Sequence, residues 1–407
     1  MPLDRRSFFG LAGVASLGAA VGVPATLAAT GQFKAFSGGS AVNFYGDHQA
    51  GISTPMQDRL YIAAFKVLDV SPDKLKSTLK EMTSAAERMS RGAGAGPIGA
   101  VGGQPESPPD DTGEALDLPA ARVTFTIGFG ESLFNSRFGF AAKKPVHFKE
   151  LPNFAGDEVS PERLGSDLII QVCADDDQVA FHAIRNLIRI SKGTLEPLWL
   201  QSGFSGASKA VASPHTPRNL FGFKDGTNNL NVNDSAETSR HLWASDGWMT
   251  GGTYLAVRNF RFDIETWDRS ALVEQEQVFG RNKGEGAPLS GGTEFTKPDF
   301  AAKSPTGETA IAADSHMALA HPSKHGGAQS LRRAYNYSNG ADKFGRLDAG
   351  LMFLSFQRDL ETQFVPIQRM LANSDRLNEY IKVIGSGAYA CPPGLKPGQF
   401  WGYQLFA

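Results

Sequence analysis

Three segments in the second half of the chain carry side chains suited to acid–base or ligand chemistry. The segment GFKDGTNN (residues 222–229) places Asp225 directly before Gly226, after an apolar lead-in. Asp-Gly pairs are common in turns, and a tight turn can hold a carboxylate at the edge of a cavity. A carboxylate held in that way could accept a proton from a bound molecule and return it.

The other two segments contain histidines and a pair of arginines. ADSHMALAHP (residues 313–322) contains His316 and His321. Imidazole is a common metal ligand, although a single histidine is more often an ordinary polar residue. SLRRAYNY (residues 330–337) contains Arg332 and Arg333, which would point to opposite faces of a strand, so only one of them could reach a given site.

Together, these segments resemble the signature strings of the dye-decolorising peroxidases, which read GxxDG, DSHxRxAxP and LRRGYNY. A fourth segment, EQEQVFGRNKGEG (residues 274–286), resembles the family string EQEQxxGRxKGEG. Ala318 stands where the family has Arg, a departure that affects local packing or outer contacts but not the ligand, and Ala334 stands where the family has Gly. The resemblance runs from about Tyr45 to Trp401, and it implies a peroxidase with one haem b per chain.

The resemblance assigns a role to several residues. It makes Asp225 the distal acid, Arg332 the distal arginine and His316 the proximal axial ligand of the haem iron. It makes Arg281 the partner of a haem propionate, since a guanidinium matches a carboxylate. Further candidate haem contacts are Asn228, and Leu354 and Phe356 as the apolar face over the haem.

These roles define an expected chemistry. Asp225 would take a proton from hydrogen peroxide and return it to the leaving oxygen, provided that its pKa stays low enough for it to be ionised. Arg332 would stabilise negative charge on that oxygen and help to keep Asp225 ionised. An acid should hold the ring N–H of His316, and the sequence leaves Asp299 and Asp314 as alternatives.

The resemblance implies that the chain reduces hydrogen peroxide and oxidises dyes, phenols or other one-electron donors. An alternative is the exported deferrochelatase subgroup of bacterial iron-uptake systems, which releases iron from haem with the porphyrin left intact. In that case components of an iron-uptake system would be partners. A non-catalytic haem carrier would need His316 but has no use for Asp225 or Arg332. The physiological reductant and the oligomeric state, including a homo-oligomer, stay open.

The N-terminal residues 1–29 have the pattern of an export signal. Arg5 and Arg6 precede a short run rich in Gly and Ala, which ends in small residues near Ala28 and Ala29. Paired arginines in this position indicate the twin-arginine route, so we expect a periplasmic or secreted protein. The formal net charge of -2 gives no indication of a nucleic-acid partner.

The remaining chain predicts an α+β fold made of two ferredoxin-like modules with antiparallel sheets, at residues 30–210 and 211–407, with haem in the C-terminal module. Hydrophobic periodicity carries this prediction. Strands are expected at 59–70, 122–129, 167–174, 252–262 and 350–357. Helices are expected at 75–91, 176–191, 264–279 and 361–384. For Cys173 and Cys391 we expect free buried thiols, while one disulfide between them stays open.

Overall fold

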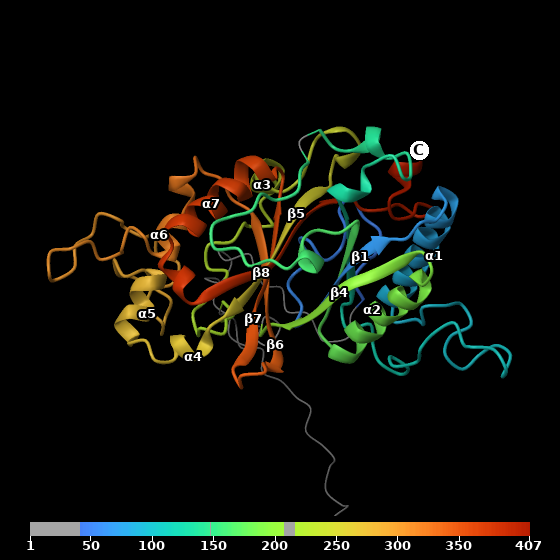
Figure 1. The fold of residues 1–407 in the computed structure, drawn as a ribbon, viewed down its shortest axis with the longest axis horizontal. Helices are drawn as coiled ribbons and strands as arrows, with labels where there is room; N and C mark the ends of the chain where they lie inside the picture. Colours follow the sequence, from blue (N-terminus) through green and yellow to red (C-terminus); the bar gives the residue numbers. More distant parts are fainter. Residues whose placement is uncertain (1–40, 147, 207–215) are drawn as a thin grey trace, which may run out of the picture. The chain divides into compact units, whose positions relative to one another are not determined.

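The two halves of the chain have the same order of strands and helices. The computed structural model describes residues 41–146, 148–206 and 216–407, so the export signal predicted at residues 1–29 lies outside the described residues. The N-terminal half contains β1 (Arg59–Val67), α1 (Pro72–Ser90), β2 (Thr124–Gly130), β3 (Leu168–Ala174), α2 (Asp177–Ser191) and β4 (Leu195–Phe204). The C-terminal half contains α3 (Ser235–His241), β5 (Thr253–Phe262), α4 (Ile264–Trp267), α5 (Leu272–Phe279), α6 (His316–Ala320), β6 (Leu331–Ala341), β7 (Leu347–Gln357), α7 (Val365–Ser374) and β8 (Ile381–Cys391) (Figure 1).

Each half forms an antiparallel four-stranded sheet with the same internal order. The N-terminal sheet runs β4-β1-β3-β2, and the C-terminal sheet runs β6-β7-β5-β8. Read from β4 and from β8, both sheets have the order fourth, first, third and second strand of the half, which is the ferredoxin-like arrangement. The predicted α+β class and antiparallel sheets are therefore confirmed.

Short pairings join the two sheets into one closed barrel. β2 meets β8 through Phe129 with Ala390 and Gly130 with Tyr389, and β4 meets β6 through the single pair Phe204 with Asn336. The two halves therefore form one continuous barrel, in which each half keeps its own ferredoxin-like strand order. Their predicted boundary at residue 210 lies outside the described residues and stays a prediction.

Local sequence signals explain the two helices of the N-terminal half. The Ser71 side chain accepts the N–H of Lys74 at the start of α1, and Pro72 occupies the first turn. Asp176 caps α2 in the same way by accepting the N–H of Val179. Both helices bury an apolar stripe in the largest hydrophobic cluster; its helical members include Leu75, Leu79, Met82, Val179, Ile184 and Leu187.

A second apolar cluster fills the interior of the barrel. It is built from one face of β1, β3, β5, β6, β7 and β8, and its members include Leu60, Ile62, Ile169, Tyr335, Leu354 and Phe356. Cys173 and Cys391 belong to this cluster and are free, buried thiols, as predicted. Within the described ranges, no helix is both long enough and apolar enough to cross a membrane.

Two predicted helices differ from the structure. The helix expected at 264–279 is divided into α4 and α5, with Asp268–Ala271 between them. The one expected at 361–384 is a π-helical turn η7 (Leu360–Phe364), then α7, a short 3₁₀ turn η8 (Arg376–Glu379) and the start of β8. β8 was missed because its small residues, such as Gly385 and Gly387, have weak strand propensity, and pairing with β5 determines its conformation.

Candidate active site

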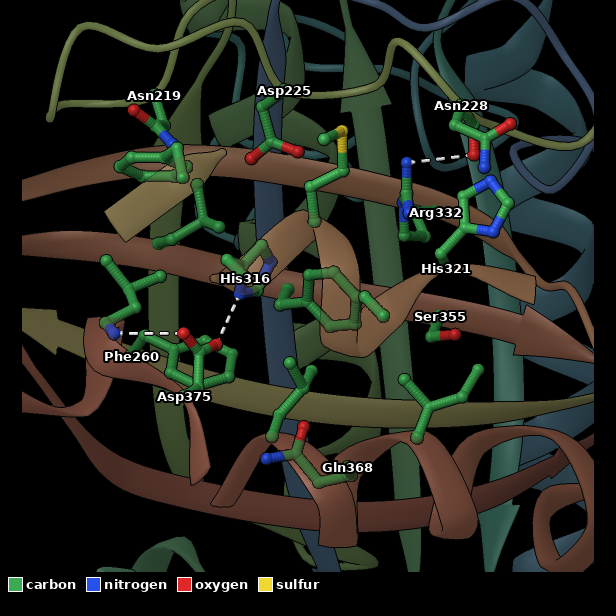
Figure 2. Close-up of a pocket in the computed structure, with 18 of the residues that line it drawn as sticks. Asn219, Asp225, Asn228, Phe260, His316, His321, Arg332, Ser355, Gln368 and Asp375 are labelled. Atoms are coloured by element: carbon green, nitrogen blue, oxygen red, sulfur yellow. Dashed lines mark hydrogen bonds and ion pairs between the residues drawn. The ribbon is translucent and has the colours of Figure 1, made fainter. Parts of the chain in front are cut away.

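A cavity of about 460 Å³ opens on the outer side of the C-terminal sheet. It is bounded by β6 and β7, by α6 and α7, and by loops around residues 219–228 and 281–298, and residues 155–157 of the N-terminal half complete its wall (Figure 2). The charged and polar side chains on its wall include Asp225, Asn228, Arg281, His316, Arg332 and Asp375. The structure therefore brings together residues from all four signature segments.

His316 is held by a buried carboxylate. His316 is the first residue of α6, and its Nδ1 lies 2.6 Å from Oδ2 of Asp375. The side chain of Asp375 is only 2% exposed. Asp375 is itself fixed, because its Oδ1 accepts the N–H of Leu377. With Nδ1 engaged, the ring turns Nε2 away from Asp375 and toward the cavity that His316 lines (Figure 2).

Neither of the two acids considered from sequence holds His316. Asp314 pairs with Arg376 at 2.7 Å, and Asp299 accepts the N–H of Ala301 on an exposed loop. Both alternatives are therefore wrong, and Asp375 is the partner. It is 59 positions from His316 in the chain, so no local spacing could indicate it.

Burial and the charge of Asp375 act in opposite directions on the pKa of His316. Burial alone lowers the pKa of His316, but the charge and hydrogen bond of Asp375, with a smaller contribution from Asp225, raise the pKa above its usual value. A neighbouring carboxylate of this kind also fixes the tautomer and increases the donor strength of the other ring nitrogen.

Arg332 lies on β6 and faces the cavity. Its Nη2 donates to the carbonyl oxygen of Asn228 at 3.2 Å, while its buried Nε has no hydrogen-bond partner among the described residues. The turn that carries Asp225 is tied to this strand by Asn229, whose Nδ2 donates to the carbonyl of Arg332 (2.8 Å) and whose Oδ1 accepts its N–H (2.9 Å). Asn229 was not predicted as a site residue, although it belongs to the same segment as Asp225.

Arg333 points the other way, as strand alternation predicted. Its guanidinium enters the barrel interior, where Nη2 donates to Oε1 of Gln57 at 2.8 Å and Nη1 donates to the carbonyl oxygens of Ile52 and Thr54. Arg332 is therefore the arginine of the pair that lines the cavity.

Burial dominates the electrostatics of Asp225. It raises the pKa of this carboxyl above the usual value, although the positive charges of Arg332 and His316 act in the opposite direction. Arg332 does favour the ionised form, as the sequence analysis expected, but its effect is smaller than that of burial. The pKa of Arg332 is lowered by burial, and Asp225 opposes that shift.

Leu354 and Phe356 do not face the cavity, which corrects their predicted contact with haem. Both are fully buried in the barrel interior, on the same face as Arg333 and Leu331, their partners on β6. Side chains alternate along a strand, so the cavity is lined instead by Leu351, Phe353 and Ser355 of β7. The prediction had the right strand and the wrong face.

Arg281 and Asn228 lie on the cavity wall as predicted. Nη1 of Arg281 donates to the carbonyl oxygens of Gly286 (2.6 Å) and Glu294 (2.9 Å), and no salt bridge to Arg281 is found in the described part of the chain. Burial and the nearby charge of Arg332 lower the pKa of Arg281, whereas Glu294 raises it. The guanidinium is therefore held in place without a carboxylate partner.

Family models and relatives match most of this chain. The model "Dyp-type peroxidase, N-terminal" matches residues 49–205, and "Dyp-type peroxidase, C-terminal" matches residues 216–396. A deferrochelatase of Shigella flexneri serotype 5b is 35% identical over 404 residues, which cover 97% of this chain and 94% of the relative. A deferrochelatase of Escherichia coli K12 is 37% identical over 362 residues, covering 87% and 84%.

Solved structures agree with this match. Ferric DtpA from Streptomyces lividans superposes with a TM-score of 0.85 at 35% identity, covering 91% of this chain and 98% of that one. A DyP-type peroxidase from Streptomyces coelicolor gives the same values. A DypB variant from Rhodococcus jostii in complex with haem, at 19% identity and a TM-score of 0.61, shares the fold. The chain belongs to the DyP-type peroxidase family of oxidoreductases.

Proposed function

We propose that the protein is a haem-dependent peroxidase that binds one haem b in the cavity of its C-terminal half, with His316 as the axial ligand. The observation that carries this proposal is the arrangement of His316, Asp225 and Arg332 around one cavity, with Nδ1 of His316 held by Asp375. Hydrogen peroxide would be the oxidising substrate, and dyes, phenols or other organic molecules would be the electron donors.

The cavity suits a flat, apolar cofactor with charged edges. Its volume is within the usual range of ligand pockets, and its walls include the apolar side chains of Phe279, Leu351 and Phe353. Among the residues that the structure describes, Arg281 has no carboxylate partner, so its guanidinium could pair with a propionate. In the described ranges, no group of three or more His, Cys, Asp or Glu side chains is arranged to hold a metal ion, so ligation through a single histidine suits an iron that the porphyrin already holds.

When bound, the haem would supply the two electrons that reduce peroxide to water. The protein would supply proton transfer and charge stabilisation. Asp225 would accept the proton of the inner peroxide oxygen and deliver it to the outer one. Arg332, a buried cation whose Nε has no hydrogen-bond partner in the described ranges, would stabilise the negative charge that develops as the O–O bond breaks.

The raised pKa of Asp225 supports a role as acid as well as base. A raised pKa lies closer to neutral pH, so both the ionised form that accepts the proton and the protonated form that returns it are accessible, although ionisation requires a higher pH than usual. Asp375 would act through His316 as a positioning residue, because it fixes the ring and leaves Nε2 for the iron.

Haem titration and peroxide kinetics test this proposal. We expect the wild type to bind haem with a Soret band, His316→Ala to lose most of this binding, and His321→Ala to keep it. Wild-type protein without a Soret band would contradict the haem assignment. Haem-bound protein that fails to oxidise any donor with peroxide would contradict the peroxidase function.

A second candidate function is iron release from haem, as in a deferrochelatase. The relatives that cover most of this chain carry that name, which is the observation in its favour. The test is to incubate the haem-loaded protein under reducing conditions and measure fluorescence of metal-free protoporphyrin. Porphyrin release that needs Asp225 or Arg332 would support this activity and partners from an iron-uptake system, whereas unchanged haem would leave peroxidase as the function.

The other expectations are included in this proposal. A non-catalytic haem carrier is less favoured because it has no use for the buried Arg332 beside Asp225.

Export by the twin-arginine route to the periplasm or beyond rests on Arg5, Arg6 and the run that follows them. Replacing both arginines with lysine should retain the protein in the cytoplasm, and cell fractionation would show it.

A further inference from the structure

The loop at residues 293–300 brings an aromatic ring to the cavity wall. Phe295, Thr296, Lys297 and Pro298 all line the cavity, and Phe295 is 67% exposed. A single exposed phenylalanine on a protein surface needs no explanation. Phe295 differs because it is both solvent-exposed and part of the cavity wall, so it lies where the cavity meets solvent.

Phe295 is held in this position by the residue before it. The carboxylate of Glu294 is buried, where it forms an ion pair with Lys224 and accepts a hydrogen bond from Thr227 (3.0 Å). The carbonyl oxygen of Glu294 accepts from Arg281. Since Glu294 is fixed inward through both its side chain and its main chain, the neighbouring side chain of Phe295 is directed outward.

The turn that contains Phe295 is closed by two further hydrogen bonds. The N–H of Thr293 donates to Oγ1 of Thr296 (2.9 Å), and the N–H of Thr296 donates to the carbonyl of Thr293 (3.1 Å). Phe300 packs edge-on against His321, with ring centroids 5.1 Å apart, and so fixes the end of the loop to the cavity wall. The aromatic ring is thus presented on a preorganised turn, which reduces the entropy cost of binding.

Lys297 places a positive charge on the cavity wall two residues after Phe295. No ion pair to Lys297 is found in the part of the chain that the structure describes. Of the acids next to it in the chain, Glu294 pairs with Lys224 and Asp299 accepts the N–H of Ala301. The pKa of His321 is lowered by burial and then by the charges of Lys297 and Arg281, so the field of Lys297 reaches the cavity wall.

We propose that Phe295 and Lys297 form a docking platform at the cavity opening for aromatic electron donors that carry an anionic group, such as an aryl sulfonate or carboxylate. The donor ring would stack on Phe295, and its anionic group would pair with Lys297. This inference rests on the proposed peroxidase function, because it concerns the molecules that supply electrons to the same cavity.

Isothermal titration calorimetry on the haem-loaded protein tests the platform directly. The probes are naphthalenesulfonate and the neutral naphthalenemethanol, which share a ring system. We expect Lys297→Gln to weaken sulfonate binding roughly threefold to fivefold and to leave the neutral probe unchanged. Phe295→Ala should weaken both probes, roughly fivefold or more.

A second pair of residues provides the matched control. Phe344 is 71% exposed beside Lys343 on the β6–β7 hairpin, and neither residue lines the cavity. Phe344→Ala and Lys343→Gln should leave both dissociation constants at the wild-type value. If the Phe295 and Lys297 variants behave like these two controls, the docking platform is contradicted.

Steady-state kinetics separate this inference from the proposed function. With peroxide at saturation, Lys297→Gln should raise KM for phenolsulfonate and leave both kcat and the KM for guaiacol unchanged. An equal KM increase for both donors would overturn the assignment of Lys297. Wild-type protein that oxidises neither donor would contradict the peroxidase function, while the calorimetric test of the platform would still hold.

Discussion

The outer faces of the two sheets, which share one topology, carry different side chains. β2, the second strand of the N-terminal half, presents Phe125, Ile127 and Phe129 to the cluster that α1 and α2 cover. β6, the second strand of the C-terminal half, presents Arg332 and Ala334 at the corresponding face. The helices of the first half therefore pack directly on their sheet, whereas the second half encloses a cavity.

The connections between strands differ in the same way. In the N-terminal half, α1 and α2 are continuous amphipathic helices of 19 and 15 residues. In the C-terminal half, the chain from β5 to β6 contains three short α-helices and long loops, and this connection brings Arg281 and His316 to the sheet. The comparison teaches that one strand order can support either a packed core or a site, depending on the connections and on a few polar substitutions.

The sharpest test of this comparison uses the adjacent arginines of β6. Arg332→Leu should slow the reaction with peroxide by roughly a hundredfold to a thousandfold, because it removes a preorganised cation from the cavity. Haem binding and thermal stability should change little. Stopped-flow absorbance after mixing with peroxide measures the rate, and a wild-type rate would show that Arg332 is not the distal arginine.

Arg333→Leu should have the opposite effects, with little change in the rate of reaction with peroxide and a clear loss of stability. It leaves the buried Oε1 of Gln57 and the carbonyls of Ile52 and Thr54 without their donor, so we expect a loss of about 2–4 kcal/mol in stability. Urea denaturation of the two variants side by side measures this. Equal stability losses for Arg332→Leu and Arg333→Leu would contradict the division between cavity and interior.

Truncation of an apolar side chain should distinguish the two outer faces. Leu79→Ala in α1 removes a fully buried side chain and should cost about 2–5 kcal/mol with the haem spectrum unchanged. Phe353→Ala on the cavity wall should cost less stability in the haem-free protein, since its ring already faces open space, but should weaken haem binding. A larger stability loss for Phe353→Ala than for Leu79→Ala would argue against this contrast.

The pH dependence of turnover tests the acid of the cavity. Asp225 must be ionised to accept a proton, and burial raises its pKa, so activity should fall as pH decreases through a value above the usual range of aspartate. In Asp225→Asn this acid limb should disappear. A profile of kcat/KM against pH that is identical in the two proteins would exclude Asp225 as the titrating group.

The smallest expected effect concerns Glu150, an acid of intermediate burial near the junction of the halves. Burial, and then the charge of Glu131, raise the pKa of Glu150 to about 7, although it accepts the N–H of Ala388 on β8. Its protonated form favours folding, so this contribution is present at low pH and is lost as pH rises through about 7. Glu150→Gln should therefore be more stable than the wild type by about 1–2 kcal/mol at pH 8. Urea denaturation should show no difference at pH 4.

The sequence was sufficient for most elements and for the residue types of the site. Strong periodicity and caps predicted α1 and α2 correctly, and shared signature strings placed His316, Arg332, Asp225 and Arg281, which the structure brings to one cavity. What failed depended on tertiary contacts. Asp375 lies far along the chain from His316, and β8 is a strand only because β5 pairs with it.

The error at Leu354 and Phe356 has a different cause. A strand was predicted in the right place, but its register relative to β6 was unknown, and a shift of one residue exchanges the faces of the sheet. The pairing of Ser355 with Arg332 fixes that register, and it could not be read from either segment alone.

The two hydrogen bonds between the Asn229 side chain and the main chain of Arg332 have a consequence for solubility. β6 pairs with β7 along its length but meets β4 only at Asn336, so its other edge would offer unpaired N–H and C=O groups to strands of other chains. The side-chain amide of Asn229 occupies both groups of Arg332 at that edge. The turn that positions Asp225 beside Arg332 therefore also covers part of the edge of β6, through which chains could otherwise aggregate.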